Sequence, residues 1–119
     1  MATPTTTYTV ADLFQNADPS VKKLYDKLMN LVRKLGPVTE SPKKTCIHLD
    51  NNSGFAGVFV RKNYINLNLR TDYEIDSPRI AKTEQVSKSR FHNLIKLESE
   101  ADLDKEFQKW LCDAYALSK

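Results

Sequence analysis

The feature that most constrains the fold of this chain is the strict alternation of residue type between positions 64 and 70. Ile65, Leu67 and Leu69 are apolar, and the residues between them are polar. Because successive side chains of a β-strand point to opposite faces of a sheet, the pattern predicts a strand with one buried and one exposed face. Such a strand needs neighbours in a sheet and a second layer that covers its apolar side.

Further strand-like segments surround this one. The predicted strands span about residues 45–51, 55–61, 64–70, 79–86 and 90–97. Most connections between them are short, as in NNSG, RKN and SKS, and such turns join antiparallel neighbours, whereas parallel strands need long crossovers. The sequence therefore predicts a five-stranded, mostly antiparallel meander, in which residues 71–78 form the one longer connection.

Two long amphipathic helices are predicted, one before and one after the strands. Asp18 and Pro19 are typical of a helix start, and Gly36 marks the end of the first helix. The second helix follows Ser99 and Asp102, which have the spacing of a capping box. In both segments apolar residues recur every three or four positions and form one stripe.

Together these elements predict an α+β domain. The most economical arrangement is a two-layer sandwich, with a five-stranded sheet and both long helices on one of its faces. Thr9 and Asp12 also have capping-box spacing, which predicts a short N-terminal helix over about residues 10–16. The Thr-rich residues 1–8 are predicted to form a mobile tail, and residues 9–119 a single domain.

The uncovered face of this sheet is predicted to be polar and rich in hydrogen-bond donors. Alternation places nine residues on it: Lys44, His48, Tyr64, Asn66, Asn68, Arg70, Arg90, His92 and Lys96. The set includes both histidines of the chain and no glutamate, while the faces of residues 55–60 and 79–86 stay ambiguous. Donor-rich surfaces of this kind suit a phosphate, a carboxylate or a nucleic acid. The candidate ligand-binding residues are Lys44, His48, Asn66, Asn68, Arg70, Arg90 and His92.

The distribution of charge favours an anionic partner for the middle of the chain. The net charge is +3, and residues 38–98 contain ten Lys and Arg against seven Asp and Glu. A small anionic ligand or a nucleic acid is therefore the predicted partner. Two other interpretations of the same face stay open. It is an ordinary solvated surface, or it is an interface for a homodimer or another protein, formed by this face or by an edge strand.

Several classes of protein are not supported by the sequence. No apolar run reaches the roughly 20 residues of a membrane span, and the first ten residues lack the pattern of a signal peptide, so a cytoplasmic protein is predicted. With only 3 glycines, the chain has no phosphate-binding loop and no G-x-S-x-G motif. No catalytic residue and no cofactor are predicted, and a non-catalytic role is favoured. An enzyme would need His48 or His92 beside an acid in a closed cleft.

Two patterns suggest metal ligands, and each has a simpler interpretation. Cys46 and His48 point to one side of a predicted strand and, with His92, would make a three-ligand site. A buried thiol and an ordinary surface histidine are favoured instead. The segment 72–76 aligns three carboxylates but lacks the Gly and Glu of an EF-hand loop, so a solvated acidic loop is favoured. No metal site is predicted, and Cys46 and Cys112 are expected to be reduced.

The chain also resembles a family of small bacterial domains known only as a domain of unknown function. The resemblance lies in the segments KKTCIHL, GFAGVFVRK, INLNLR, SPRIAKTEQVSKSRFHNLIKLESEADLDKEFQKWL and DAYALS. Some members of that family carry the label "predicted transport protein", and others are fused to larger proteins, including restriction-enzyme-like ones. The resemblance spans roughly residues 10–118 and is most specific from Ser77 to Leu111.

The resemblance implies a compact α+β domain of bacterial origin and brings no catalytic residues with it. It marks several motif-like positions: Lys44-Thr45, Arg79, Lys82, Glu84, Arg90, His92, Asp102 and Asp104. Of these, Asp102 and Asp104 are explained by helix capping and the helix dipole. The transport label has no support in the residues, which show neither a membrane span nor a substrate motif.

Overall fold

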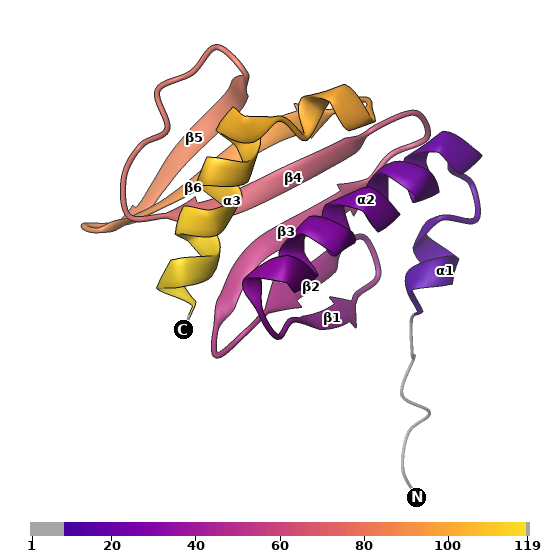
Figure 1. Ribbon diagram of the computed structural model, residues 1–119, viewed down its shortest axis with the longest axis horizontal. Helices are drawn as coiled ribbons and strands as arrows, with labels where there is room; N and C mark the ends of the chain where they lie inside the picture. The colour runs from indigo at the N-terminus through magenta and orange to yellow at the C-terminus, as the bar shows by residue number, and fades with distance from the viewer. Residues whose placement is uncertain (1–8, 119) are drawn as a thin grey trace, which may run out of the picture.

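A six-stranded antiparallel sheet forms one layer of the protein, and helices form the other (Figure 1). The structure is a computed structural model that describes residues 9–118, and the predicted tail over residues 1–8 lies outside the described residues. The helices are α1 (Val10–Leu13), α2 (Pro19–Leu35), the 3-10 turn η1 (Glu100–Asp102) and α3 (Lys105–Leu117). The strands are β1 (Thr39–Pro42), β2 (Ile47–Asp50), β3 (Gly54–Val60), β4 (Ile65–Thr71), β5 (Ile80–Ser87) and β6 (Arg90–Leu97).

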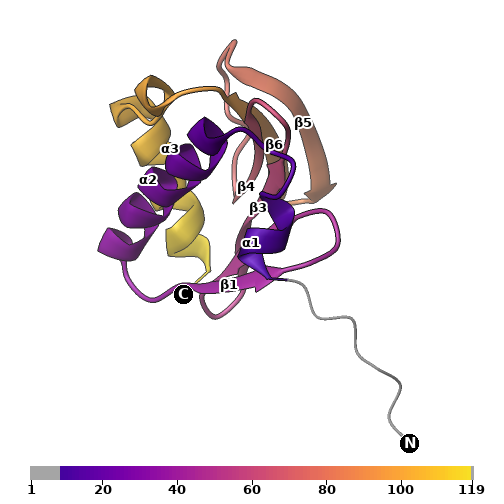
Figure 2. The ribbon, with the colours of Figure 1, turned by 90° about the vertical axis from the view of Figure 1, so that its right-hand side faces the viewer.

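Helices α2 and α3 cover the same face of the sheet, as predicted (Figure 2). Their apolar stripes and the inward residues of the central strands form one core, in which Leu28 of α2, Phe107 of α3 and Leu67 of β4 are 0% exposed. The opposite face of the sheet, called the open face below, has no such cover among the described helices (Figure 2). Within residues 9–118, none of the helices combines the length and the apolar character that crossing a membrane requires.

The helix boundaries confirm most of the sequence signals and correct two of them. Thr9 and Asp12 form the predicted capping box, but α1 ends at Leu13 rather than near residue 16. The box of Ser99 and Asp102 begins η1, whereas α3 starts later, after Asp104 accepts a hydrogen bond from the amide of Phe107 at 3.0 Å. The acidic run therefore contains two successive helix starts instead of one.

The sheet has a sixth strand that the sequence did not predict. The segment TESP of β1 has no alternation of apolar and polar residues and ends in proline, so nothing local marks it as a strand. It pairs with β2 at the edge, and its Glu40 accepts hydrogen bonds from the hydroxyl of Tyr25 and from Arg33 on α2. These tertiary contacts hold the segment extended.

The strand order also corrects the predicted meander. The order is β1-β2-β3-β4-β6-β5, so β5 lies at the far edge and β6 inserts between β4 and β5. Burial explains this order, since Ile95 and Leu97 of β6 are 0% exposed, whereas most of β5 is exposed. The more apolar strand takes the central position, and the long connection after β4 makes the detour possible.

A buried polar side chain fixes that connection to the sheet. Asn93 of β6 is 0% exposed and points toward the helices. Its amide group donates to the hydroxyl of Thr71 at 2.8 Å and to the carbonyl of Leu69 at 3.2 Å, and its oxygen accepts from the amide of Ile75 at 3.3 Å and the hydroxyl of Thr83 at 3.4 Å. Every buried side-chain N or O atom among the described residues has a partner.

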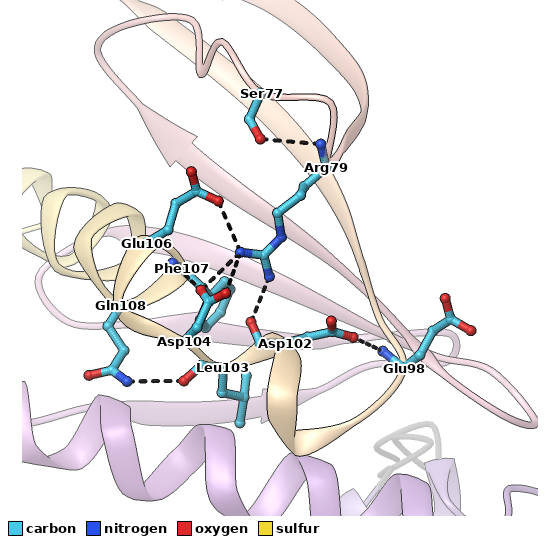
Figure 3. A network of polar contacts seen from close by, with 9 residues as sticks. All are labelled: Ser77, Arg79, Glu98, Asp102, Leu103, Asp104, Glu106, Phe107 and Gln108. Atoms are coloured by element: carbon cyan, nitrogen blue, oxygen red, sulfur yellow. Dashed lines mark hydrogen bonds and ion pairs between the residues drawn. The ribbon is translucent and has the colours of Figure 1, made fainter.

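Arg79, just before β5, fixes the other end of the connection to α3 (Figure 3). Its Nη1 lies 2.9 Å from Asp104 Oδ1 and 3.1 Å from Glu106 Oε1, and its Nη2 donates to the carbonyl of Asp102 at 2.7 Å. The guanidinium also lies 5.5 Å from the ring centroid of Trp110. We call this group the Arg79 cluster. The Phe107 amide and the Arg79 guanidinium together lower the pKa of the Asp104 carboxyl.

Candidate ligand-binding face

The pairing of β4 and β6 places the predicted polar residues on the open face. Arg70 lies opposite His92, and Asn66 lies opposite Lys96. Between these pairs Asn68 lies opposite Leu94. Because the intervening residues of both strands point toward the helices, the faces predicted for residues 64–70 and 90–97 are confirmed.

Strand register resolves the faces of the two ambiguous segments. Gly57 pairs with both His48 and Asn68, so it lies on the open face. Glu84 lies opposite His92, and this places a carboxylate there as well. The prediction of a face without glutamate is therefore wrong. Alternation did not assign Glu84 to the open face because β5 contains two bulges, which break the period of two that a regular strand would show.

A β-bulge also explains why β3 is apolar on both sides in the sequence. Leu49 pairs with Ala56 and Asp50 with Gly54, which leaves Phe55 as the extra residue. Phe55 is 1% exposed and packs edge-on against Tyr115 of α3, so it points into the core. The bulge places Gly54 on the open face beside Asp50.

The open face is hollowed where β3 has no side chains to fill it. The depression has a volume of about 150 Å³ and is lined by His48, Asp50, Gly54, Phe55, Ala56, Gly57, Phe59, Asn68, Arg70 and His92. We call it the Gly57 depression. A Cβ atom added to Gly57 would meet only the ring of Phe59, 3.7 Å away, so the space above this residue is open.

Arg70 is the cation of the Gly57 depression, and its side chain has no ion pair with any residue from 9 to 118. The carboxylate of Asp50 approaches it across Gly54: a Cβ atom on that glycine would lie 3.0 Å from Asp50 Oδ1 and 4.0 Å from both terminal nitrogens of Arg70. Asp50 itself accepts a hydrogen bond of 3.5 Å from the hydroxyl of Ser41. The face therefore has both a cation and an anion at its centre.

His92 lies between a cation and an anion on neighbouring strands. Partial burial lowers the pKa of its imidazole, the nearby charge of Arg70 lowers it further, and the charge of Glu84 raises it. The net direction is downward, so the ring is neutral at pH 7 and has one donor and one acceptor nitrogen. A neutral ring can donate one hydrogen bond to an anion without adding charge.

The structure does not bring all predicted residues together. His48, Asn68, Arg70 and His92 line the Gly57 depression, and Asn66 lies further along the same face. Two of the predicted residues, Arg90 and Lys44, lie away from the Gly57 depression. Arg90 is at the β5–β6 turn and donates to the carbonyl of Ser89 at 2.8 Å, and Lys44 is in the β1–β2 turn, where it lines a different hollow.

Sequence reasoning did not identify Gly54, Gly57 and Asp50 as parts of the depression. One signal was available, since glycine inside a strand often marks a bulge or a place where something approaches the backbone closely. The segment GFAGVFV contains two such glycines. In the part of the chain that the structure describes, no group of three or more His, Cys, Asp or Glu side chains is arranged to hold a metal ion, and Cys46 is buried.

Comparison with known proteins identifies a family. A family model described as "Domain of unknown function (DUF5655)" matches residues 10–118. No curated protein and no solved structure shows significant similarity to the chain.

Proposed function

The chain belongs to the family that this model describes, and we propose that it is a non-catalytic module that binds a small anion in the Gly57 depression. The proposed ligand group is a carboxylate or a phosphate. The observation that carries this proposal is the state of Arg70, a half-buried residue that lines the depression and has no ion pair among the described residues. Arginine matches the planar geometry of carboxylates and phosphates, and a partly desolvated arginine gains most from such a partner.

The neighbours of Arg70 suit an anion that also carries a hydroxyl or amino group. The amide of Asn68 and the neutral ring of His92 each supply a donor beside the guanidinium. The carboxylate of Asp50 is an acceptor on the other side of Gly54, and it would repel an anion that brings no donor of its own. This mixture favours a hydroxy acid, an amino acid or a phosphorylated sugar over a bare inorganic anion.

The size of the depression limits what it holds. A volume of about 150 Å³ accommodates one anionic group and a few neighbouring atoms, while typical sites for drug-sized ligands measure roughly 300–1,000 Å³. We therefore expect millimolar affinity for the anionic group alone. The rest of a larger ligand would extend over Asn66 and Lys96 on the same face.

A nucleic acid fits this face less well than a small anion. Binding of single strands without sequence preference relies on exposed aromatic rings on which bases stack. On the open face Phe59 is half-buried, and the ring of Tyr64 already has the ammonium group of Lys96 4.4 Å from its centroid. Base stacking here would require displacing that contact.

A homodimer formed by edge strands is the alternative function, and both edges hinder it. β1 has only four residues and ends at Pro42. β5 has two bulges and presents Lys82 and Glu84, which are features that block pairing between edges. Val86, 46% exposed on β5, is the one large apolar side chain that the described part of the chain exposes. A single side chain of this kind is a small contact for a stable dimer.

The proposal is tested by titrating the isotope-labelled protein with sodium citrate, a hydroxy acid, and following the amide chemical shifts; sodium phosphate, a bare inorganic anion, should cause the same shifts only at higher concentration. We expect the shifts to concentrate at Gly54, Gly57, Asn68 and His92. Replacing Arg70 with methionine should abolish them, because methionine retains the apolar stem and removes the charge. Arg90→Met is the matched control, since it removes an arginine from the same face outside the depression. Equal losses in both variants, or shifts spread over all basic residues, would contradict the proposal.

A further inference from the structure

Two turns at one end of the sheet contain four basic residues. The β1–β2 turn contains Lys43 and Lys44, and the β3–β4 turn contains Arg61 and Lys62 (Figure 1). Each turn is closed by one backbone hydrogen bond: Lys43 N–H donates to the Cys46 carbonyl at 2.7 Å, and Arg61 N–H to the Tyr64 carbonyl at 2.9 Å. We call these four residues the basic turns.

The basic turns are exposed, and their charges are not balanced locally. All four residues are exposed, and none of them makes an ion pair with another residue of the described chain. Two acids lie nearby. Asp12 accepts the Thr9 amide at 2.9 Å in the capping box, and Asp18 begins α2 beside Lys62, whose carbonyl accepts the Asp18 amide at 2.8 Å. The local excess is two positive charges.

A hollow separates the two turns and gives the surface a groove. It has a volume of about 430 Å³ and lies between both turns and the segment that includes α1, with Lys44, Arg61 and Lys62 on its walls. Strands in a sheet are roughly 4.8 Å apart, so turns whose centres differ by two strand positions are about 10 Å apart. A nucleic-acid strand has one phosphate per roughly 3.4 Å of its axis, so both turns would reach phosphates about three nucleotides apart.

We propose that the basic turns bind the phosphate backbone of a nucleic acid, without reading its sequence. Membrane binding would need an exposed apolar group beside the cations, and the apolar residues that line the hollow, Leu13, Ala17 and Val60, are half-buried. The exposed large apolar side chain of the described chain, Val86, is at the opposite end of the sheet. Backbone contacts from lysine and arginine position a protein on a nucleic acid and make its affinity depend on salt. The proposal does not rest on Arg70 or on the Gly57 depression.

The experiment measures fluorescence anisotropy of labelled oligonucleotides of about 12 nucleotides, single- and double-stranded, between about 50 and 200 mM salt. If four phosphates are contacted, the affinity of the unmodified protein for duplex DNA should fall roughly 100-fold over this range. The affinity of a variant that lacks the two charges of one turn should fall only roughly tenfold. The two variants are Lys43→Ala with Lys44→Ala, and Arg61→Ala with Lys62→Ala. Both should fold, because the bonds that close the turns are made by backbone atoms.

The control removes two charges from a surface away from the basic turns. Lys27 and Lys34 are exposed on α2, so Lys27→Ala with Lys34→Ala changes the net charge by the same amount. This control should retain the salt dependence of the unmodified protein. The proposal is overturned if the control weakens binding as much as the turn variants do. It is equally overturned if neither oligonucleotide binds at the lowest salt, or if anionic lipid vesicles bind to the basic turns while the oligonucleotides do not.

Discussion

His92 and Asn93 are consecutive residues of β6, and they point to opposite faces of the same sheet. Asn93 is 0% exposed and makes four hydrogen bonds, while the ring of His92 makes none with the described residues. The same contrast separates two arginines. Arg79 has two carboxylates, a carbonyl and an indole ring as partners, whereas Arg70 on the open face has no ion pair within residues 9–118.

These two pairs of residues distinguish structural polar groups from candidate binding groups in this protein. A polar side chain whose donors and acceptors are all hydrogen-bonded within the protein stabilises the fold and has no free donor or acceptor for a ligand. A polar side chain that is partly desolvated and has no partner adds little to stability, and its donors and acceptors are free to bind a ligand. Substitution of a polar residue on the helix-covered face should therefore lower the free energy of unfolding more than substitution of one on the open face.

The largest expected effect is at Asn93. Replacing it with alanine leaves the amide of Ile75 and the hydroxyls of Thr71 and Thr83 without this partner inside the core, and the free energy of unfolding should fall by about 3 kcal/mol. His92→Ala should change it by less than about 0.5 kcal/mol. Urea denaturation of the two variants measures both values, and a similar loss of unfolding free energy in both would contradict the distinction between the two faces.

A smaller effect is expected for the two arginines. Arg79→Met removes the interactions of a side chain that is 24% exposed with two carboxylates and one carbonyl group. Because solvent screens these interactions, the free energy of unfolding should fall by about 1.5 kcal/mol. Arg70→Met should cost less than about 0.5 kcal/mol. If Arg70→Met proved the more destabilising of the two in urea, Arg70 would be structural and the proposed function would lose its main support.

The pH dependence of stability should also differ between the two regions. The pKa of His92 is below its ordinary 6.5 in the folded protein, so the unfolded chain binds the proton first and stability falls as pH drops from 6.5 to the folded pKa. The pKa of Asp104 is below its ordinary 3.8, so its contribution is present above 3.8 and is lost as pH falls through the lower folded pKa. Melting temperatures measured as a function of pH should fall in two separate pH ranges, one for His92 and one for Asp104. Arg70→Met should narrow the range for His92, because removing the charge of Arg70 brings the folded pKa of His92 closer to 6.5.

The smallest effect on stability is expected for Gly57→Ala. The added methyl group contacts only Phe59, at 3.7 Å, so the free energy of unfolding should change by less than about 0.5 kcal/mol. The same methyl group occupies the Gly57 depression, so the citrate-induced shifts should weaken. Unchanged shifts in a folded Gly57→Ala protein would mean that the anion binds elsewhere.

The sequence predicted much of the open face because alternation is a local property. Asn66, Asn68, Arg70 and His92 were assigned to it from period two alone, and strand pairing confirms their placement. The signal failed where the strands are irregular. A bulge at Phe55 and two in β5 reverse the phase, so Gly57 and Glu84 could be assigned only from the register of neighbouring strands.

The features that could be predicted from the sequence alone each belong to a single helix or strand: the apolar stripes of α2 and α3, the capping boxes, and the two faces of β4 and β6. Packing between distant segments determines which strands are neighbours and that TESP becomes β1. It also determines that Arg79 has several partners, whereas Arg70 has no ion pair within residues 9–118. The physical reason is that periodicity arises from the geometry of successive residues, whereas the state of a polar group depends on which distant residues packing brings beside it.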